Sequence, residues 1–386
     1  MELDLSEEHR LIQATVREFA AREIAPAAAR LDQEARYPED LIARAAALGL
    51  MGLMVPEQYG GAGMDGVANV LVQEELARAS AGVQVIISVN NSLVCDPILR
   101  FGSEEQKRRY LPALAGGRSL GCYCLTEAAA GSDAMAIATR AELHGGEWLL
   151  TGRKLFVTNG VEADLCIVYA RSESTPGARG LSAFLVEKSF PGIRVGKVEH
   201  KLGIRCSSTT EILLDECQVP AANLLGARGE GGRIALATLD GGRIGIAAQA
   251  LGLARAALEA STAHAKGRWL FGRALSEFQA TQWALADMAT RIEAARLLAY
   301  RAAWLRHRGE RCGREAATAK LIASETAMWA THRAVQLFGG YGYVQDYPLE
   351  RYFRDAKITE IYEGTSEILR LVISRDLVGS RGSALG

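Results

Sequence analysis

The sequence predicts a multidomain α+β protein, in which a helical N-terminal block and a C-terminal bundle of long helices flank a middle β domain. Three observations support this: apolar residues at helical spacing towards both ends, short apolar runs between turn residues in the middle, and a length of 386 residues. A chain of that length exceeds one ordinary hydrophobic core, so two or three packed domains are expected. We expect the boundaries at residues 1–120, 121–226 and 227–386.

The first block carries start and stop signals for several helices. Ser6 is a candidate N-cap, Pro38 can occupy the first turn of a helix that Gly49 ends, and another helical stretch follows Asp65. Residues 61–66 match the pattern G-x-G-x-x-G, but a turn precedes them instead of an apolar strand. The geometry that cradles a pyrophosphate needs that strand, so we interpret the segment as a glycine-rich connection.

The middle block contains apolar runs of strand length, separated by glycine, proline and asparagine pairs. These runs are residues 148–150, 155–157, 165–169, 183–186 and 212–214. Short strands with turns between them predict an antiparallel β-barrel or sandwich, not a doubly wound fold.

The third block returns to a helical period in long, alanine-rich segments. Helices are expected at residues 230–265, 275–308 and 313–338, and a shorter one after Thr365. Alanine favours helices and lets them pack closely, which is typical of a bundle.

Composition excludes several classes of function. Lysine plus arginine (44) nearly equals aspartate plus glutamate (45), so a net charge of -1 offers no footprint for nucleic acid and no polybasic membrane anchor. Residues 1–5 are acidic where a secretory signal would be basic, and no uninterrupted apolar run is long enough to cross a bilayer. We therefore expect a cytoplasmic protein in a bacterium, or one of the mitochondrial matrix after processing in a eukaryote.

The cysteines and histidines predict neither a disulfide framework nor a metal site. The seven cysteines form no C-x-x-C pair, and the six histidines form no cluster along the sequence. Cys122 and Cys124 alternate around Tyr123 in an apolar run, so we interpret them as small buried residues of a strand.

Glu363 is the candidate catalytic residue. It precedes Gly364, and Thr365 or Ser366 can cap the helix that follows. For these residues alone, an exposed carboxylate in a loop is the commoner interpretation. The alternative is a carboxylate held on a tight turn, where Gly364 lets a ligand approach the backbone.

Several motifs, in one order and over nearly the whole chain, resemble the acyl-CoA dehydrogenase family, especially its short-chain, butyryl-CoA-type members. An ordered set of motifs is more specific than any one of them. The segments that carry the resemblance are residues 55–61, 123–127, 131–133, 157–160, 239–247, 336–342 and 361–368.

The resemblance implies an activity, a cofactor and partners. Glu363 would remove the α-proton of an acyl-CoA thioester while N5 of FAD accepts the β-hydride, giving the trans-2-enoyl-CoA. Short-chain or branched short-chain substrates are expected. Electron-transfer flavoprotein would be the electron acceptor, and the protein would assemble as a homotetramer. We expect neither a nucleic-acid partner nor association with a membrane.

The resemblance also implies binding roles, although each of these residues has an ordinary structural interpretation when taken singly. The FAD contacts within one subunit would be Tyr123, Leu125, Thr126, Gly131, Ser132, Phe156, Thr158, Thr365 and Glu367. The contacts to the FAD of a neighbouring subunit would be Arg268, Phe271, Gln279, Gln336, Gly339 and Gly340. The acyl-CoA contacts would be Ser132, Asp240, Arg243, Tyr362 and Gly364.

The chain departs from the family pattern at two places beside the expected flavin. Ala128, Ala129 and Ala130 follow Glu127 where the family usually has Pro-Gly, and Phe156 stands where relatives usually have tryptophan. Relatives of the isovaleryl type carry the base just before the arginine that matches Arg243. Here that residue is Gly242, which cannot act as a base, so Glu363 is the remaining choice.

Three alternatives stay open. The same fold and cofactor would serve a flavin-dependent oxidase, such as an acyl-CoA oxidase or a nitroalkane oxidase, although the latter carry aspartate at the base position. A dehydrogenase could instead act on medium-chain or carrier-protein-bound thioesters. A non-catalytic protein of this fold that binds nucleic acid would need a basic face, for which the charge balance gives no sign.

Overall fold

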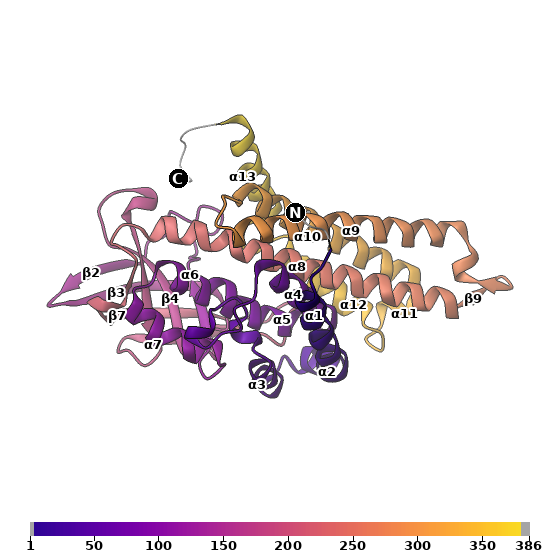
Figure 1. The fold of residues 1–386 in the computed structure, drawn as a ribbon, viewed down its shortest axis with the longest axis horizontal. Coiled ribbons are helices and arrows are strands. Elements are labelled where there is room, and N and C mark those ends of the chain that lie inside the picture. Colours follow the sequence, from indigo (N-terminus) through magenta and orange to yellow (C-terminus); the bar gives the residue numbers. More distant parts are fainter. Residues whose placement is uncertain (1–3, 380–386) are drawn as a thin grey trace.

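The computed structural model describes residues 4–379 and has three parts in chain order: helices, a β-sheet, and a second set of helices (Figure 1). Residues 1–3 and 380–386, which include most of the acidic start, lie outside this description. The predicted fold class is therefore confirmed. The boundaries at 1–120, 121–226 and 227–386 stay a prediction.

The N-terminal helices begin where the sequence signals predict. Ser6 Oγ accepts a hydrogen bond from the His9 N–H at 3.2 Å, and Asp65 Oδ1 accepts one from the Ala68 N–H at 2.8 Å. Gly49 follows the third helix with a positive φ of 75°. The elements are α1 (Glu7–Phe19), η1 (Ala20–Ile24), α2 (Ala25–Glu34), α3 (Glu39–Ala47), η2 (Leu50–Gly52), η3 (Glu57–Tyr59), α4 (Gly66–Ala79), α5 (Ala81–Ser88), η4 (Val89–Cys95), α6 (Asp96–Phe101) and α7 (Glu104–Ala115).

One helical stretch within residues 4–379, Ala81–Phe101, is long and apolar enough to cross a membrane. In the protein, 89% of its apolar window is buried, as in a core helix. The glycine-rich segment 61–66 lies between η3 and α4, so it follows no strand, as the sequence predicts.

The middle part is an eight-stranded sheet with the order β6-β7-β3-β2-β4-β5-β8, and β1 pairs with β4. Most neighbouring strands are antiparallel, but β1 and β2 are both parallel to β4, so the sheet is mixed. Two predicted runs, 148–150 and 155–157, belong to one long strand with a register shift between them. The strands are β1 (Gly121–Cys124), β2 (Arg140–His144), β3 (Glu147–Thr158), β4 (Leu165–Arg171), β5 (Leu181–Glu187), β6 (Ile193–Val198), β7 (Thr209–Pro220) and β8 (Leu224–Leu225).

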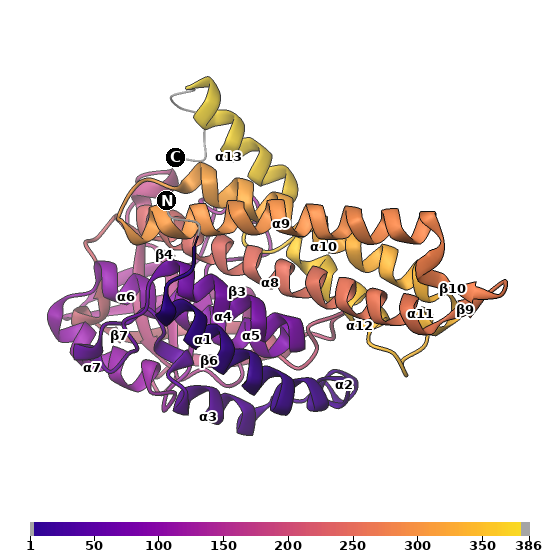
Figure 2. The same ribbon diagram turned by 45° about the vertical axis from the view of Figure 1, so that its right-hand side comes forward.

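The C-terminal part is a bundle of long helices that extends beyond the sheet (Figures 1 and 2). Its far end carries a two-stranded hairpin, and the C-terminal part of α13 projects from the bundle in Figure 2. The start of α13 packs on α10, where Leu369 joins Ala317 and Leu321 in a buried cluster. The predicted helix 275–308 begins later, because Leu275–Glu277 form a short 3-10 turn. The elements are α8 (Gly231–Gly267), β9 (Trp269–Leu270), β10 (Arg273–Ala274), η7 (Leu275–Glu277), α9 (Gln279–His307), α10 (Gly313–Phe338), α11 (Gly340–Tyr343), α12 (Leu349–Thr359) and α13 (Ser366–Val378).

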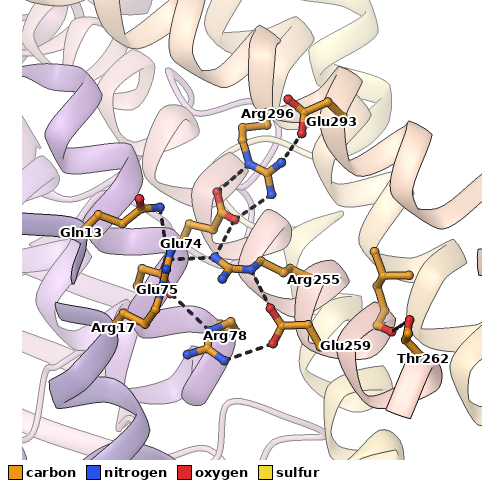
Figure 3. Close-up of polar contacts among 11 residues, drawn as sticks. Gln13, Arg17, Glu74, Glu75, Arg78, Arg255, Glu259, Thr262, Glu293 and Arg296 are labelled. Atoms are coloured by element: carbon orange, nitrogen blue, oxygen red, sulfur yellow. Dashed lines mark hydrogen bonds and ion pairs between the residues drawn. The ribbon is translucent and has the colours of Figure 1, made fainter. Parts of the chain in front are cut away.

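Buried ion pairs join the two helical parts. Glu74 and Glu75 of α4 have side chains that are 2% and 0% exposed, and they face arginines of α8 and α9 (Figure 3). Arg255 Nη1 lies 2.8 Å from Glu75 Oε1, and Arg296 Nη2 lies 2.9 Å from Glu74 Oε1. Arg17 of α1 adds a further contact to Glu75 at 2.8 Å. Together these pairs fix α4 against α9 and against α8, the helix that faces Glu363.

Candidate active site

Glu363 lies on a strained turn between α12 and α13. Glu363 and Gly364 both adopt positive φ, at 54° and 104°. Thr365 then caps α13, since its Oγ1 accepts a hydrogen bond from the Ile368 N–H at 3.3 Å. A residue other than glycine at positive φ is costly, and such strain is often found at functional sites.

The side chain of Glu363 points at α8. A Cβ atom added at Gly242 would overlap Glu363 Oε2 and would lie 2.9 Å from Cδ2 of Leu93. Position 242, where some relatives carry the base, and the carboxyl of Glu363 therefore occupy the same space. The glycine is required for Glu363 to reach this position.

The environment of this carboxyl group favours a base of near-neutral pKa. Although Glu363 as a whole keeps some exposure, its Oε2 is buried and has no hydrogen-bond partner among the described residues. Burial raises the pKa of Glu363 to about 7, against the opposing effects of Lys320 and Arg243. A carboxylate with such a pKa is ionised in part at neutral pH and is basic enough to accept a proton.

Four of the expected acyl-CoA contacts surround the same turn. Arg243 is buried in α8, where its Nη1 lies 3.0 Å from Asp240 Oδ1 and its Nε donates to the carbonyl of Glu363 at 3.4 Å. Tyr362 donates its hydroxyl to Gln249, and Gly364 completes the turn. Burial raises the pKa of Asp240 and of Tyr362.

Tyr123, the first expected flavin contact, lies near this group on β1. Its ring packs on that of Tyr169, with centroids 5.1 Å apart, and its buried hydroxyl has no hydrogen-bond partner among residues 4–379. Burial raises its pKa, and Tyr169 and Glu363 add to the effect. Leu125 and Thr126 follow β1, and Thr126 accepts a hydrogen bond from the Leu155 N–H of β3 at 2.9 Å.

Phe156 and Thr158 lie at the end of β3. Phe156 has a positive φ of 56° and remains 65% exposed, which is unusual for an aromatic residue inside a strand. Lys154, on the same strand, is fully buried, and its Nζ lies 2.7 Å from Glu127 Oε1 and 3.2 Å from the Leu125 carbonyl. This ion pair links the two segments that carry the expected flavin contacts.

The loop with the three alanines forms a tight turn. Glu127 and Ala130 exchange two backbone hydrogen bonds, at 3.2 and 3.1 Å, and none of the three alanines adopts a positive φ. The turn therefore closes without glycine. Gly131 and Ser132 follow it and are exposed.

The residues expected to reach a neighbouring flavin gather at the far end of the bundle, away from Glu363 (Figure 1). Phe271, in the turn of the β9–β10 hairpin, is 94% exposed. The guanidinium of Arg268, the residue that ends α8 just before the hairpin, lies 5.6 Å from the ring centroid of Tyr341, so the end of α8 contacts α11. The exposed residues at this end are Arg268, Phe271, Gln279, Gln336, Gly339 and Gly340.

Thr365 and Glu367, the remaining expected contacts, begin α13 beside the turn of Glu363. Thr365 caps the helix and is half-buried, whereas Glu367 is exposed. Both therefore lie on the Glu363 side of the molecule, unlike the six residues at the far end.

Two residues near Glu363 were missed by sequence reasoning. Lys320 of α10 is fully buried and donates from Nζ to the Gly364 carbonyl at 2.7 Å. Gln249 of α8 is also fully buried and accepts the hydroxyl of Tyr362. The sequence signal that could have identified them is a charged or amide side chain at an apolar position of an alanine-rich helix.

The sequence also gave no sign that Cys166 joins Cys122 and Cys124. The three sulfur atoms lie within 4.8 Å of one another, inside the core of the sheet. A three-thiolate metal site would need all three sulfurs ionised. Hydrogen bonds to the other two cysteines raise the pKa of Cys122, burial raises that of Cys124, and only the pKa of Cys166 is lowered, by hydrogen bonds from its two neighbours. We assign this cluster to the core.

Comparison with known families covers nearly the entire chain. Residues 6–118 match the acyl-CoA dehydrogenase N-terminal domain, residues 122–217 its middle domain, and residues 229–378 its C-terminal domain.

Individual relatives can be aligned with this chain over all or nearly all of their own length. An acyl-CoA dehydrogenase of Bacillus subtilis is 52% identical over 98% of this chain and 100% of its own, and a short-chain-specific acyl-CoA dehydrogenase of Clostridium acetobutylicum is 48% identical over 97% and 99%. Butyryl-CoA dehydrogenase from Megasphaera elsdenii superposes with a TM-score of 0.96 at 42% identity, covering 98% of this chain and 100% of that chain. A Mycobacterium smegmatis glutaryl-CoA dehydrogenase in complex with FADH2 superposes with a TM-score of 0.93 at 34% identity, covering 98% and 96%. The chain therefore belongs to the acyl-CoA dehydrogenase family and is an oxidoreductase of that class.

Proposed function

We propose that this enzyme converts short-chain acyl-CoA thioesters to trans-2-enoyl-CoA with FAD as cofactor, and that Glu363 removes the α-proton. The observation that carries the proposal is the buried carboxyl oxygen of Glu363, which has no partner within residues 4–379 and lies against Gly242. A structural carboxylate would be paired in such a place, whereas a base must be left free to accept a proton.

The turn that holds Glu363 also supplies a group for the thioester oxygen. Within the described residues, the backbone N–H of Glu363 donates no hydrogen bond to the protein. An N–H held rigidly beside the base can stabilise the charge that develops on the thioester oxygen as the α-proton leaves. Gly364, which has no side chain, leaves that backbone accessible.

The residues around the turn fit a flavin. Phe156 offers an exposed ring, and the buried Tyr123 hydroxyl lacks a protein partner within the described chain. A methyl group added at Gly131 would meet no atom of this chain within 4 Å, so this backbone is open to a ligand. The same holds at the far end of the bundle for Gly339 and Gly340, the residues expected to meet a neighbouring subunit's flavin. When bound, FAD would supply the acceptor for the hydride of the β-carbon. The FADH2 complex of the glutaryl-CoA dehydrogenase relative supports this choice of cofactor.

The chain-length preference rests on a polar group along α8. Gln249 follows Gly242 by seven residues, so it lies on the same helix face about 10 Å further along. Its amide is satisfied on both sides, by the Tyr362 hydroxyl and by the Ala81 carbonyl at 3.0 Å. A long acyl chain that extended past this point would break buried hydrogen bonds, which costs about 1–3 kcal/mol for each group left unpaired. Short acyl chains avoid that cost, in agreement with the names of the C. acetobutylicum and M. elsdenii relatives.

Family membership also supports a proposal for the assembly and for the electron acceptor. We propose a homotetramer in which the exposed cluster of Arg268, Phe271, Gln279, Gln336, Gly339 and Gly340 meets a neighbouring subunit's flavin. An aromatic side chain that is 94% exposed, as Phe271 is, favours such a contact surface. Electron-transfer flavoprotein is the proposed acceptor.

A panel of acyl-CoAs mixed anaerobically with the purified enzyme tests the proposal. The flavin band should bleach fastest with butyryl-CoA and more slowly as the chain lengthens, and Gln249→Ala should shift the optimum towards longer chains. If the purified enzyme binds no flavin, the proposal of FAD as cofactor is contradicted. If long-chain substrates bleach the flavin equally fast, the proposed preference for short chains is contradicted. Rapid reoxidation of the product-bound enzyme by air would indicate an oxidase instead.

A further inference from the structure

Lys320 is an unusual residue for the interior of a protein. Its side chain is fully buried, and its neighbours on the inner face of α10 are alanines 316, 317, 319 and 323, which are also fully buried. Burying an ammonium group is costly unless other groups compensate for the lost water. A lysine in this position therefore calls for a specific partner.

That partner is the turn that carries the proposed base. Lys320 Nζ donates a hydrogen bond to the Gly364 carbonyl at 2.7 Å. Glu363 and Gly364 both have positive φ values, and a turn of this kind persists only when its surroundings hold it. The ammonium group provides such a constraint, from a helix that is separate in sequence from the turn.

Charged groups from outside α10 face Lys320. Glu360 and Glu363 come from the segment that joins α12 to α13, Glu367 from the first turn of α13, and Arg243 from α8. Burial lowers the pKa of Lys320 to about 8, with Glu363 opposing this effect and Arg243 adding to it. Lys320 is therefore mostly protonated at neutral pH.

The same electrostatic interaction acts on Glu363. The charged groups that face its carboxyl are Lys320 and Arg243, and the titratable hydroxyls of Tyr123 and Tyr362 lie nearby. Among the charges, the effect of Lys320 is the larger one, and it opposes burial. Without it, the carboxyl would hold its proton to higher pH.

We propose that Lys320 is a positioning residue of this enzyme: its ammonium group fixes the Gly364 carbonyl and thereby holds Glu363 against Gly242. Its charge also favours the ionised form of that carboxylate. The inference rests on the proposed role of Glu363 as the base. It adds that the position and the ionisation of the Glu363 carboxylate depend on Lys320, a residue outside the proposed substrate and cofactor contacts. A purely structural lysine would stabilise the contact between α10 and α13 and leave the titration of Glu363 unchanged.

Lys320→Met tests this distinction, because methionine has nearly the same length and no charge. Infrared difference spectra of the holoenzyme across pH, without substrate, report the carboxyl band of Glu363, which Glu363→Gln identifies by its loss. The Met variant should titrate at least about one unit higher than the wild type. Its kcat/KM for butyryl-CoA at pH 6 should fall at least about tenfold, and the loss should shrink as the pH rises.

Ser324→Ala is the matched control. Ser324 lies one turn further along α10, and its Oγ donates to the Lys320 carbonyl at 2.7 Å, so this variant disturbs the same helix without changing its charge. The Glu363 band of this control should titrate as in the wild type. Unchanged titration of Glu363 in Lys320→Met, whatever the stability of that variant, would overturn the inference.

Reciprocity gives a second measurement, which does not depend on whether Lys320→Met folds. If the two charges interact, Glu363→Gln must lower the pKa of Lys320, as followed by the carbon-13 resonance of its Cε atom. An unchanged lysine titration would also overturn the inference. A failure of the proposed function can be told apart from a failure of this inference. Near-native turnover by Glu363→Gln would show that Glu363 is not the base, whatever the titration of Lys320.

Discussion

Two buried carboxylates, Glu75 of α4 and Glu363 of the turn before α13, both lie against α8 but differ in their partners. Glu75 accepts hydrogen bonds from Arg17 and Arg255, at 2.8 Å each, and is 0% exposed. Glu363 Oε2 has no hydrogen-bond partner among the residues described. It occupies the space that a side chain at Gly242 would fill.

The pKa values of the two groups move in opposite directions. Burial alone would raise both, but the arginines outweigh it for Glu75 and lower its pKa. For Glu363, burial exceeds the effects of Lys320 and Arg243, and the pKa rises to about 7. A buried carboxylate that is paired stabilises the fold, and one that is left unpaired is available for chemistry.

Glu363→Gln should have the largest effect on activity. The amide fills the same space but cannot accept the α-proton, so kcat should fall by about 10²–10⁴-fold or more while bound FAD is retained. Steady-state assays with butyryl-CoA and the flavin absorbance of the purified variant measure the two properties. Loss of flavin together with activity would indicate a structural defect and contradict the assignment.

Glu75→Gln should have the largest effect on stability. Removing one charge of a buried network leaves its arginines without compensation, so we expect a loss of about 3 kcal/mol in the free energy of unfolding at pH 7. Urea denaturation measures it. The control is Glu259→Gln, whose side chain is 45% exposed and pairs with the same Arg255, and which should cost less than about 1 kcal/mol. An equal loss of unfolding free energy in Glu75→Gln and Glu259→Gln would contradict a special role for the buried, paired carboxylate.

Gly242→Ala should misplace the base without removing it. Its methyl group would overlap Glu363 Oε2, so the carboxyl must move, and such a displacement lowers kcat by about 10²-fold. Gly267→Ala, at the end of the same helix, would meet no atom within 4 Å and serves as the control. Near-native turnover by Gly242→Ala would show that the base tolerates another position.

The stability of the two carboxylate sites should respond to pH with opposite sign. Because the pKa of Glu363 is raised to about 7 from 4.5, its stabilising effect is present below pH 4.5 and is lost as the pH rises through about 7. Glu363→Gln should therefore be more stable than the wild type at pH 8, by about 2 kcal/mol, and should gain little at pH 4.5. The lowered pKa of Glu75 means that its contribution is present above pH 4.5 and is lost as the pH falls through its folded pKa. A Glu363→Gln variant that is less stable than the wild type at pH 8 would contradict this account.

Phe156→Gly should give the smallest effect. Phenylalanine at a φ of 56° is strained by about 1 kcal/mol, and glycine removes that strain, so the melting temperature of the flavin-free protein should rise slightly. The dissociation constant for FAD should rise as well, because the exposed ring is lost. Phe156→Ala removes the ring but keeps the strain, which separates the two effects. Unchanged FAD affinity in both variants would remove Phe156 from the flavin site.

Local signals made much of the fold predictable. Ser6, Asp65 and Gly49 mark helix ends through hydrogen bonds and φ values set within a few residues, and the structure confirms all three. The long alanine-rich helices were predicted for the same reason, since their period repeats many times. The strand pairing was less accessible, because the parallel pairing of β1 with β4 joins residues that are distant in sequence.

The candidate site was predictable only in part. The resemblance named Glu363, and the absence of a side chain at Gly242 left no other base. Lys320 lies 43 residues before the base, and its contact with the Gly364 carbonyl depends on how α10 packs. The same holds for Glu74 and Glu75, whose partners Arg255 and Arg296 are about 180 and 222 residues away. No local pattern encodes such pairings.

Exchange of the α-hydrogen of butyryl-CoA with deuterated water tests the role of Glu363 most directly, because it requires the base alone. Proton NMR of the thioester, incubated anaerobically with the holoenzyme, follows the exchange. In the wild type the exchange rate should rise with pH through about 7, and in Glu363→Gln exchange should be lost. Exchange at the wild-type rate in that variant would contradict it.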